Sequence, residues 1–172
     1  KMKFESPIRI GEQVKKVITI ADIAMKEGNS GKMCFVTTTE EVFGEDDRLT
    51  TSETRTQVYR EPADPNAPRP PTRPAPSEAV WSRTIHPGSV LLFRYSALTM
   101  NSHKIHYDKD YVRDVEGYPG LLVHGPLTMT LMLDLFRREN PGATMTSLDL
   151  RAVSPVYDTM DFSVHGAPGD DG

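Results

Sequence analysis

The chain has 172 residues, of which 37% are hydrophobic and 26% charged, an ordinary composition for a globular protein. A net charge of -4 without a run of lysine and arginine argues against nucleic-acid binding, which normally needs a basic patch. Cys34 is the only cysteine, which excludes an internal disulfide and a cysteine zinc cluster. No apolar stretch approaches the roughly 20 residues that span a bilayer. We therefore expect a soluble protein with no nucleic-acid or membrane partner, built as one large or two small domains.

The first part of the chain favours an antiparallel β-meander. Residues 13–23, 33–41 and 50–59 are rich in β-branched side chains. They are separated by Gly28-Asn29-Ser30-Gly31 and by Gly44-Glu45-Asp46-Asp47, whose composition is typical of turns. The pattern predicts consecutive strands that pair with their neighbours.

A proline-rich segment follows the meander. Residues 61–76 contain half of the chain's 14 prolines, which lack a backbone donor and fix φ, so the segment suits neither a sheet nor a helix interior. We expect a linker over 62–80 between an N-terminal unit, 1–61, and a C-terminal unit, 81–172.

The second part mixes helix and strand signals. The apolar run 90–95 predicts a strand, and the charged residues 107–115 a short helix or turn. Residues 127–136 are apolar on nearly every face, which predicts a buried helix, and 137–142 end it with cations, an amide and Pro-Gly. Strands are expected over 144–153 and 160–165. A buried helix flanked by strands indicates an α+β sheet wrapped around a helix. Because Lys1 is not an initiator and the last strand has no return strand, we expect the sequence to be part of a longer protein.

Two segments carry the chemistry. Residues 101–108 read Asn-Ser-His-Lys-Ile-His-Tyr-Asp, and residues 121–126 read Leu-Leu-Val-His-Gly-Pro at the start of the expected helix. Histidine transfers protons near neutral pH, and a helix start offers unpaired N–H groups that favour negative charge. A proton-transfer group beside an oxyanion site indicates chemistry at a carbonyl.

Residues 96–108 and 117–127 resemble the MaoC-like hotdog hydratases and dehydratases. They are most similar to the branch that contains mitochondrial hydroxyacyl-thioester dehydratase type 2 and the mesaconyl-CoA and itaconyl-CoA hydratases. This resemblance implies a double hotdog, with a degenerate N-terminal unit whose helix lies upstream of Lys1. It places the active site in the second unit, around a central helix from Gly125 to Asn140.

The family motif, Asp-x-Asn-Pro-x-His, assigns the expected site residues. His106 takes the place of the family histidine, Asn101 that of the aspartate and His103 that of the motif asparagine. Since an asparagine cannot accept a proton, the resemblance implies that His106 is the main acid/base and that Asn101 positions water. His103 is expected to contact the substrate or orient Asn101, with solvent exposure as the alternative. It also implies that the Gly125 N–H binds the thioester carbonyl oxygen. A packing role for Gly125 and a metal site of His103, His106, Asp108 and His124 are alternatives, although the spacing of the latter matches no familiar zinc motif.

The activity that the resemblance implies is reversible conversion of a (3R)-hydroxyacyl-thioester to a trans-2-enoyl-thioester in fatty-acid metabolism. Hydration of mesaconyl-CoA or itaconyl-CoA, thioester hydrolysis, and acyl-thioester binding without catalysis are the alternatives. The substrate would be carried by CoA or acyl carrier protein, with no metal or redox cofactor. A homodimer and a mitochondrial location, or alternatively a cytoplasmic one, are expected by the same analogy.

Overall fold

A computed structural model describes residues 1–28, 31–60 and 78–169. The chain forms two compact units. The first comprises the described part of Lys1–Pro68 together with Thr144–Leu150, and the second the described parts of Arg69–Ala143 and Arg151–Gly172. The first unit is mainly an antiparallel sheet, and the second combines two antiparallel strands with the α-helices, so the chain is of the α+β class.

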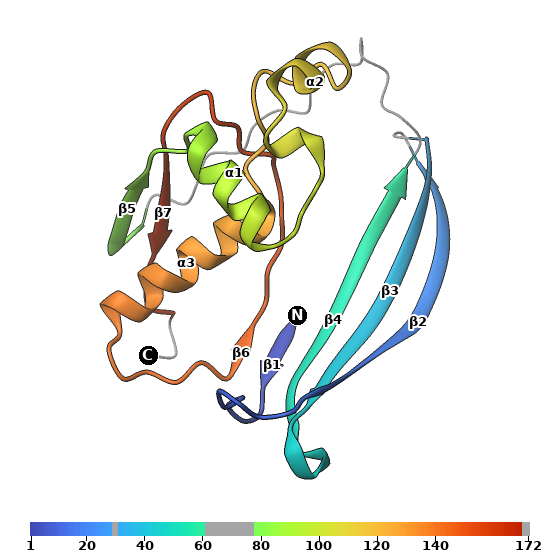
Figure 1. The fold of residues 1–172 in the computed structure, drawn as a ribbon, viewed down its shortest axis with the longest axis vertical. Coiled ribbons are helices and arrows are strands. Elements are labelled where there is room, and N and C mark those ends of the chain that lie inside the picture. Colours follow the sequence, from blue (N-terminus) through green and yellow to red (C-terminus); the bar gives the residue numbers. More distant parts are fainter. Residues whose placement is uncertain (29–30, 61–77, 170–172) are drawn as a thin grey trace. The chain divides into compact units, whose positions relative to one another are not determined.

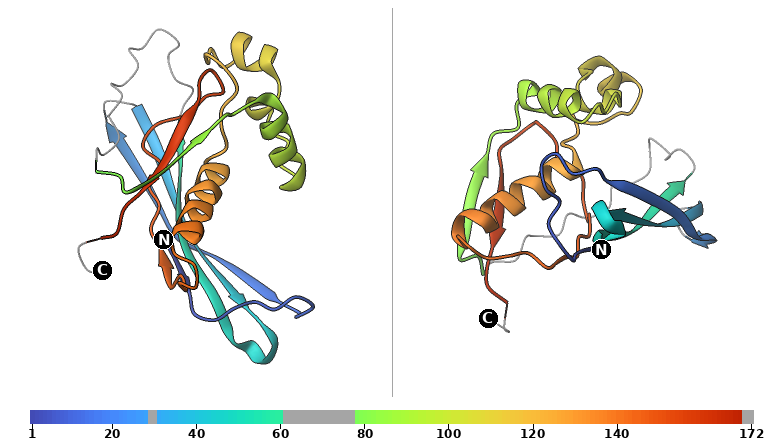
Figure 2. Two further views of the ribbon diagram at one scale, coloured as in Figure 1. Left: turned by 90° about the vertical axis from the view of Figure 1, so that its left-hand side faces the viewer. Right: turned by 60° about the horizontal axis from the view of Figure 1, so that its bottom comes forward.

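The first unit is a 5-stranded antiparallel sheet in the order β2-β3-β4-β1-β6. Its long members are β2 (Lys15–Gly28), β3 (Gly31–Phe43) and β4 (Leu49–Arg60), and its short ones are β1 (Met2–Phe4) and β6 (Ser147–Leu148). The three long strands lie side by side and bend together (Figures 1 and 2). The β3–β4 connection contains the short helix η1 (Glu45–Asp47). The predicted meander is confirmed.

The register places four apolar side chains of β2 on one face of this sheet. Ile18, Ile20, Ile23 and Met25 of β2 lie opposite Glu40, Thr38, Val36 and Cys34 of β3, and residues directly opposite share a face. Each of these four β2 side chains is more than half exposed. On the other face, Thr37 and Thr39 of β3 lie opposite Thr56 and Thr54 of β4. The helix expected upstream of Lys1 stays a prediction.

The second unit holds the helices. A 2-stranded antiparallel sheet of β5 (Trp81–Ile85) and β7 (Phe162–Gly166) contacts α3 (Gly125–Glu139). The chain also forms α1 (Ser89–Leu98), η2 (Lys104–His106) and α2 (Lys109–Asp114), labelled in Figure 1. The core of this unit consists of Leu92, Ile105, Val112, Leu121, Val123 and Leu127, with Ile85, Leu135 and Val164 between α3 and the sheet. The expected helices over 107–115 and Gly125 to Asn140 are confirmed.

The strand predicted over 90–95 is wrong, because these residues form the middle of α1. An apolar run this short has no decisive periodicity. In the structure Leu92 and Ser96, one helical turn apart, are buried while Phe93 and Arg94 are exposed. Packing of that single stripe selects the helix.

The strand predicted over 144–153 is largely wrong. Only Ser147–Leu148 is a strand, and it pairs with Met2 and Lys3 of β1 in the first unit, although the sequence suggested a place in the second. Pairing partners far apart in the sequence leave no local signal. The prediction over 160–165 is confirmed by β7, which begins at Phe162. Most of the linker expected over 62–80 belongs to residues 61–77, which lie outside the described residues.

One polar residue in the apolar helix α3 has a clear role. Asp134 Oδ2 accepts hydrogen bonds from Arg83 of β5 at 2.6 Å and from Arg138 at 2.8 Å, so it ties α3 to the sheet.

Helices of the described ranges are all too short or too polar to cross a membrane.

Candidate functional site

The loop after α1 brings Asn101 into a defined conformation. Met100 adopts a left-handed φ of 52°, and the Asn101 N–H donates to the carbonyl of Ser96 at 2.9 Å. The Asn101 side-chain oxygen then accepts the His103 N–H at 3.0 Å. Because a backbone N–H needs an acceptor, this bond identifies Oδ1 and leaves the NH₂ group of Asn101 as the part that can donate to a ligand.

His106 is buried, with 7% of its surface exposed. Its Nδ1 lies 2.7 Å from the carbonyl oxygen of Leu122, which can only accept, so Nδ1 carries the hydrogen. Burial is the main cause that lowers the pKa of His106, and nearby His103 lowers it further, against an opposing effect of the Leu122 bond. A neutral imidazole with its hydrogen on Nδ1 keeps a lone pair on Nε2, so Nε2 is the ring nitrogen of His106 that can accept a proton.

His124 lies against His106, and the sequence suggested it only as a ligand in the metal alternative. The two rings stack with their centroids 3.7 Å apart and 16° between their planes. His124 is 1% exposed, and its Nε2 shares a 2.8 Å hydrogen bond with the hydroxyl of Ser96. Burial first, and then His106, lower the pKa of His124 to about 4. In the sequence, the only indication of a role for His124 beside His106 was its position, a polar residue inside an apolar run directly before the helix start.

A set of backbone contacts holds the segment that carries His124. The Leu122 N–H donates to Ile105 at 2.9 Å, and the Val123 N–H donates to Val156 at 2.8 Å. The Leu121 N–H donates to the Asp158 carboxylate at 2.7 Å. Hydrogen bonds to Ile105 on one side and to Val156 and Asp158 on the other thereby fix the segment. They explain how His124 and His106, far apart in the sequence, keep a fixed relative position.

Gly125 begins α3 directly after His124. The first helical bond runs from the Thr128 N–H to the His124 carbonyl, Pro126 has no N–H, and His124 provides no side-chain cap. Within the described residues the Gly125 N–H therefore has no acceptor, as expected at a helix start. A Cβ added at Gly125 would meet no described atom within 4 Å, so steric packing among those residues does not require a glycine there.

A surface pocket of about 300 Å³ lies beside these groups. Its lining residues are Phe93, Ser96, Ala97, Met100, Asn101, Ser102 and Tyr107, none of which carries a formal charge. Ser96 and Asn101 thus line the pocket, and Ser96 also bonds to the His124 ring that stacks on His106. His103 is exposed, with its ring centroid 6.0 Å from that of His106 and 80° between the planes.

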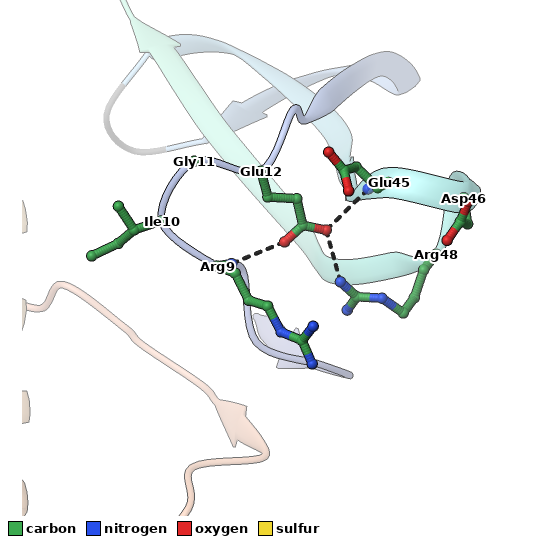
Figure 3. A pocket seen from close by; sticks show the side chains of 7 residues that line it. All are labelled: Arg9, Ile10, Gly11, Glu12, Glu45, Asp46 and Arg48. Carbon is green, nitrogen blue, oxygen red and sulfur yellow. Dashed lines mark hydrogen bonds and ion pairs between the residues drawn. The ribbon is translucent and has the colours of Figure 1, made fainter.

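A second pocket, of about 350 Å³, lies in the first unit (Figure 3). Its central carboxylate belongs to Glu12, which accepts hydrogen bonds from the N–H groups of Arg9 at 2.9 Å and Glu45 at 3.0 Å. Arg48 adds a bond at 2.8 Å. These bonds lower the pKa of Glu12, the backbone donors most strongly. The carboxylate is occupied in holding the β3–β4 connection, a structural role.

The metal alternative gains no support from this geometry. The described residues contain no group of three or more His, Cys, Asp or Glu side chains placed to hold a metal ion. His124 and His106 instead face each other ring to ring, and Asp108 caps α2 by accepting the Tyr111 N–H at 3.0 Å.

Comparison with known sequences shows which family this chain belongs to. The family model of hydroxyacyl-thioester dehydratase type 2 matches residues 1–158. Mesaconyl-C(4)-CoA hydratase of Chloroflexus aurantiacus is 38% identical over 99% of this chain and 60% of its own length. The mitochondrial hydroxyacyl-thioester dehydratase type 2 of Schizosaccharomyces pombe is 40% identical over 41% of this chain and 24% of its own length. The chain thus matches less than two thirds of the length of either relative.

Solved structures support the fold. HtdX of Mycobacterium tuberculosis matches with a TM-score of 0.69 at 20% identity, over 99% of this chain and 65% of that one. Another protein of that organism, described as having a double hotdog fold, matches with a TM-score of 0.54 at 17% identity, over 93% of this chain and 58% of that one. The fold is the double hotdog, and the chain belongs to the hydroxyacyl-thioester dehydratase type 2 family.

Proposed function

We propose that the protein containing this chain catalyses reversible hydration of a trans-2-enoyl-thioester to a (3R)-hydroxyacyl-thioester, with His106 as the acid/base. One observation carries the proposal. The Leu122 carbonyl holds the hydrogen of His106 on Nδ1, and burial lowers the pKa of the ring, so Nε2 is an unprotonated base at neutral pH.

The proposed reaction uses the same histidine twice. The NH₂ group of Asn101 donates to the oxygen of a water molecule and orients it. His106 Nε2 takes a proton from that water as its oxygen bonds to the β-carbon of the substrate. The carbon–carbon double bond opens toward the thioester carbonyl, and the Gly125 N–H donates to the negative oxygen that forms. His106 then returns the proton to the α-carbon, which completes a syn addition and regenerates the base.

The substrate class follows from the pocket beside Asn101. Its lining carries no formal charge, which favours a neutral acyl chain, because a carboxylate removed from water needs a cation or strong donors. The acyl group would arrive as a thioester of CoA or acyl carrier protein, and the proposed steps need no metal or redox cofactor. A place in fatty-acid metabolism is proposed on the same grounds.

Hydration of a dicarboxylic acyl-CoA is the second candidate. It is supported by 38% identity to mesaconyl-C(4)-CoA hydratase over 99% of this chain. Itaconyl-CoA is a substrate of the same dicarboxylic class. Thioester hydrolysis is disfavoured, because it needs a free carboxylate as base or nucleophile and Asp108 of the motif is occupied in capping α2.

Compartment and assembly are proposals of the same kind. The Schizosaccharomyces pombe relative is named as mitochondrial, which supports a mitochondrial location, whereas the Chloroflexus relative is bacterial and supports the cytoplasmic alternative. A homodimer is proposed because two-fold pairing is the commonest assembly of soluble proteins.

The test is spectrophotometric hydration of crotonyl-CoA and mesaconyl-C4-CoA by the full-length protein. We expect turnover with crotonyl-CoA and a loss of about 10²- to 10⁴-fold in kcat for His106→Ala. Asn101→Ala should lose about tenfold to a hundredfold, since water is then misplaced. His165→Ala, which changes an exposed histidine of β7, is the matched control. Preference for mesaconyl-C4-CoA would select the second candidate, and acyl-CoA binding without turnover would show a noncatalytic module.

A further inference from the structure

The stacked pair of His106 and His124 contains a group that the proposed steps do not use. His124 neither faces the pocket nor caps α3 with its side chain, yet it is among the most buried large side chains of the described residues. Its Nδ1 has no hydrogen-bond partner among them. A buried polar ring with an unpartnered nitrogen costs stability, so its presence calls for an explanation.

Contacts from a second element hold the His124 ring in place. The hydroxyl of Ser96, on α1, shares a 2.8 Å hydrogen bond with Nε2. Tyr95, also on α1, meets the ring edge-on with centroids 4.9 Å apart and 63° between the planes. The orientation of His124 is therefore set by α1 and by the backbone at the start of α3, and not by His106 alone.

We propose that His124, oriented by Ser96, is a positioning residue for His106: its ring fixes the plane of the His106 imidazole and covers one face of it. This inference rests on the proposed function, because it assigns a role in the same site. A single hydrogen bond from Nδ1 to the Leu122 carbonyl leaves the His106 ring free to rotate about that bond. A flat ring stacked at 3.7 Å and 16° removes this rotation and so directs Nε2.

The electrostatics of the pair agree with this role. Two titratable groups face His106: His103 lies at the edge of its ring and His124 lies across its face. Tyr95 of α1 contacts the ring of His124. With its pKa lowered to about 4, His124 stays neutral when His106 accepts a proton, so the pair never holds two positive charges at neutral pH. A neutral aromatic face is also a favourable neighbour for an imidazolium.

The first experiment measures the tautomer and the pKa of His106 directly and does not depend on catalytic turnover. Long-range ¹H–¹⁵N NMR of the full-length protein reports the tautomer and the pKa of each histidine. In His124→Ala, water reaches the uncovered face of His106, so we expect its pKa to rise toward the ordinary value and the Nδ1–H preference to weaken. His124→Phe restores a flat ring, and we expect it to keep the titration of His106 close to that of the wild type. Ser96→Ala should give an intermediate change, and His165→Ala none.

Kinetics provide the second measurement. We expect His124→Ala to lower kcat by about tenfold or more with KM within about threefold, and to move the acid limb of the pH profile upward. His124→Phe should recover most of that loss, which a merely structural role would not predict if both variants are equally folded. If His124→Ala does not fold, Ser96→Ala and His124→Phe carry the same comparison.

The two proposals fail in different ways. An unchanged His106 tautomer, titration and kcat in folded His124→Ala would overturn the positioning role. A wild-type protein without turnover, in which His124→Ala still shifts the titration of His106, would overturn the proposed function and leave the positioning role standing.

Discussion

His106 donates its Nδ1–H to the carbonyl oxygen of Leu122 at 2.7 Å, across 16 residues of sequence. This bond joins the two segments that the motif suggested and decides which ring nitrogen is left as the base. The pKa of His106 lies below its ordinary value of 6.5, mainly because the ring is buried.

The pH dependence of hydration follows from that shift. His106 is proposed to act as a base in its neutral form, and kcat/KM reports the ionisation of the free enzyme, so kcat/KM should rise with pH along an acid limb whose midpoint lies below 6.5. A pH profile of crotonyl-CoA hydration between pH 4 and 8 measures it. A midpoint at or above the ordinary histidine value would contradict the assignment of His106.

Stability should depend on pH through His124. Its pKa falls from 6.5 in the unfolded chain to about 4 in the folded protein, so between these values the unfolded state binds more protons. The contribution of His124 is fully present above pH 6.5 and is lost as the pH falls toward 4. The loss in unfolding free energy is of the order of 3 kcal/mol. Urea unfolding at a series of pH values measures it, and His124→Phe should flatten this part of the curve.

Substitution by alanine should lower the unfolding free energy at Gly120 but not at Gly125. A Cβ at Gly120 would lie 2.6 Å from Asp158 Oδ1 and 2.7 Å from Thr159 Cγ2, so Gly120→Ala should cost about 1–3 kcal/mol of unfolding free energy. Gly125 has open space, so Gly125→Ala should leave that free energy within about 1 kcal/mol of the wild type. Its methyl group would crowd the N–H that we propose to bind the thioester oxygen, and KM should rise. Equal losses of stability in both variants would contradict this reading.

The Glu12 carboxylate should matter to the first unit alone. Glu12→Gln replaces one of the two acceptor oxygens by an NH₂ group, which would face the N–H of either Arg9 or Glu45, so the thermal midpoint should fall (Figure 3). Because hydrogen bonds lower the pKa of Glu12 below its ordinary 4.5, its contribution is present above pH 4.5 and is lost as the pH falls through the lower folded value. Thermal unfolding at pH 6 and pH 3 should show the difference between variant and wild type shrinking in acid.

The Asp134 ion pairs are partly exposed and should be weak. Asp134→Asn removes the charge that Arg83 and Arg138 share, with an expected loss of at most about 1 kcal/mol that diminishes in high salt. Guanidinium unfolding is unsuitable, since it screens the pair, so urea is the denaturant of choice. Unchanged kcat would confirm that this residue has no part in catalysis, whereas a large loss would show that the tilt of α3 matters to the site.

The sequence was informative where one segment determines its own structure. Segments rich in β-branched residues and separated by turn residues predicted β2, β3 and β4, and the long apolar run with its Pro-Gly end predicted α3, because local composition and terminal residues suffice there. Residues 101–108 and 121–126 supplied His106, Asn101 and Gly125 as site candidates. Their catalytic roles stay predictions that the variants above test.

Other features depend on contacts between distant segments and have no local signature. The run 90–95 became a helix because one stripe of α1 packs into the core, and Ser147–Leu148 became a strand because β1 offers a free edge. The tautomer of His106 is set by Leu122, and the partnership of His124 with Ser96 by the packing of α1 beside the start of α3. From its sequence alone, this protein shows which side chains could do chemistry at a thioester. Only the tertiary structure decides which nitrogen of His106 keeps its lone pair and which ring stacks on it, because both follow from neighbours brought together by folding.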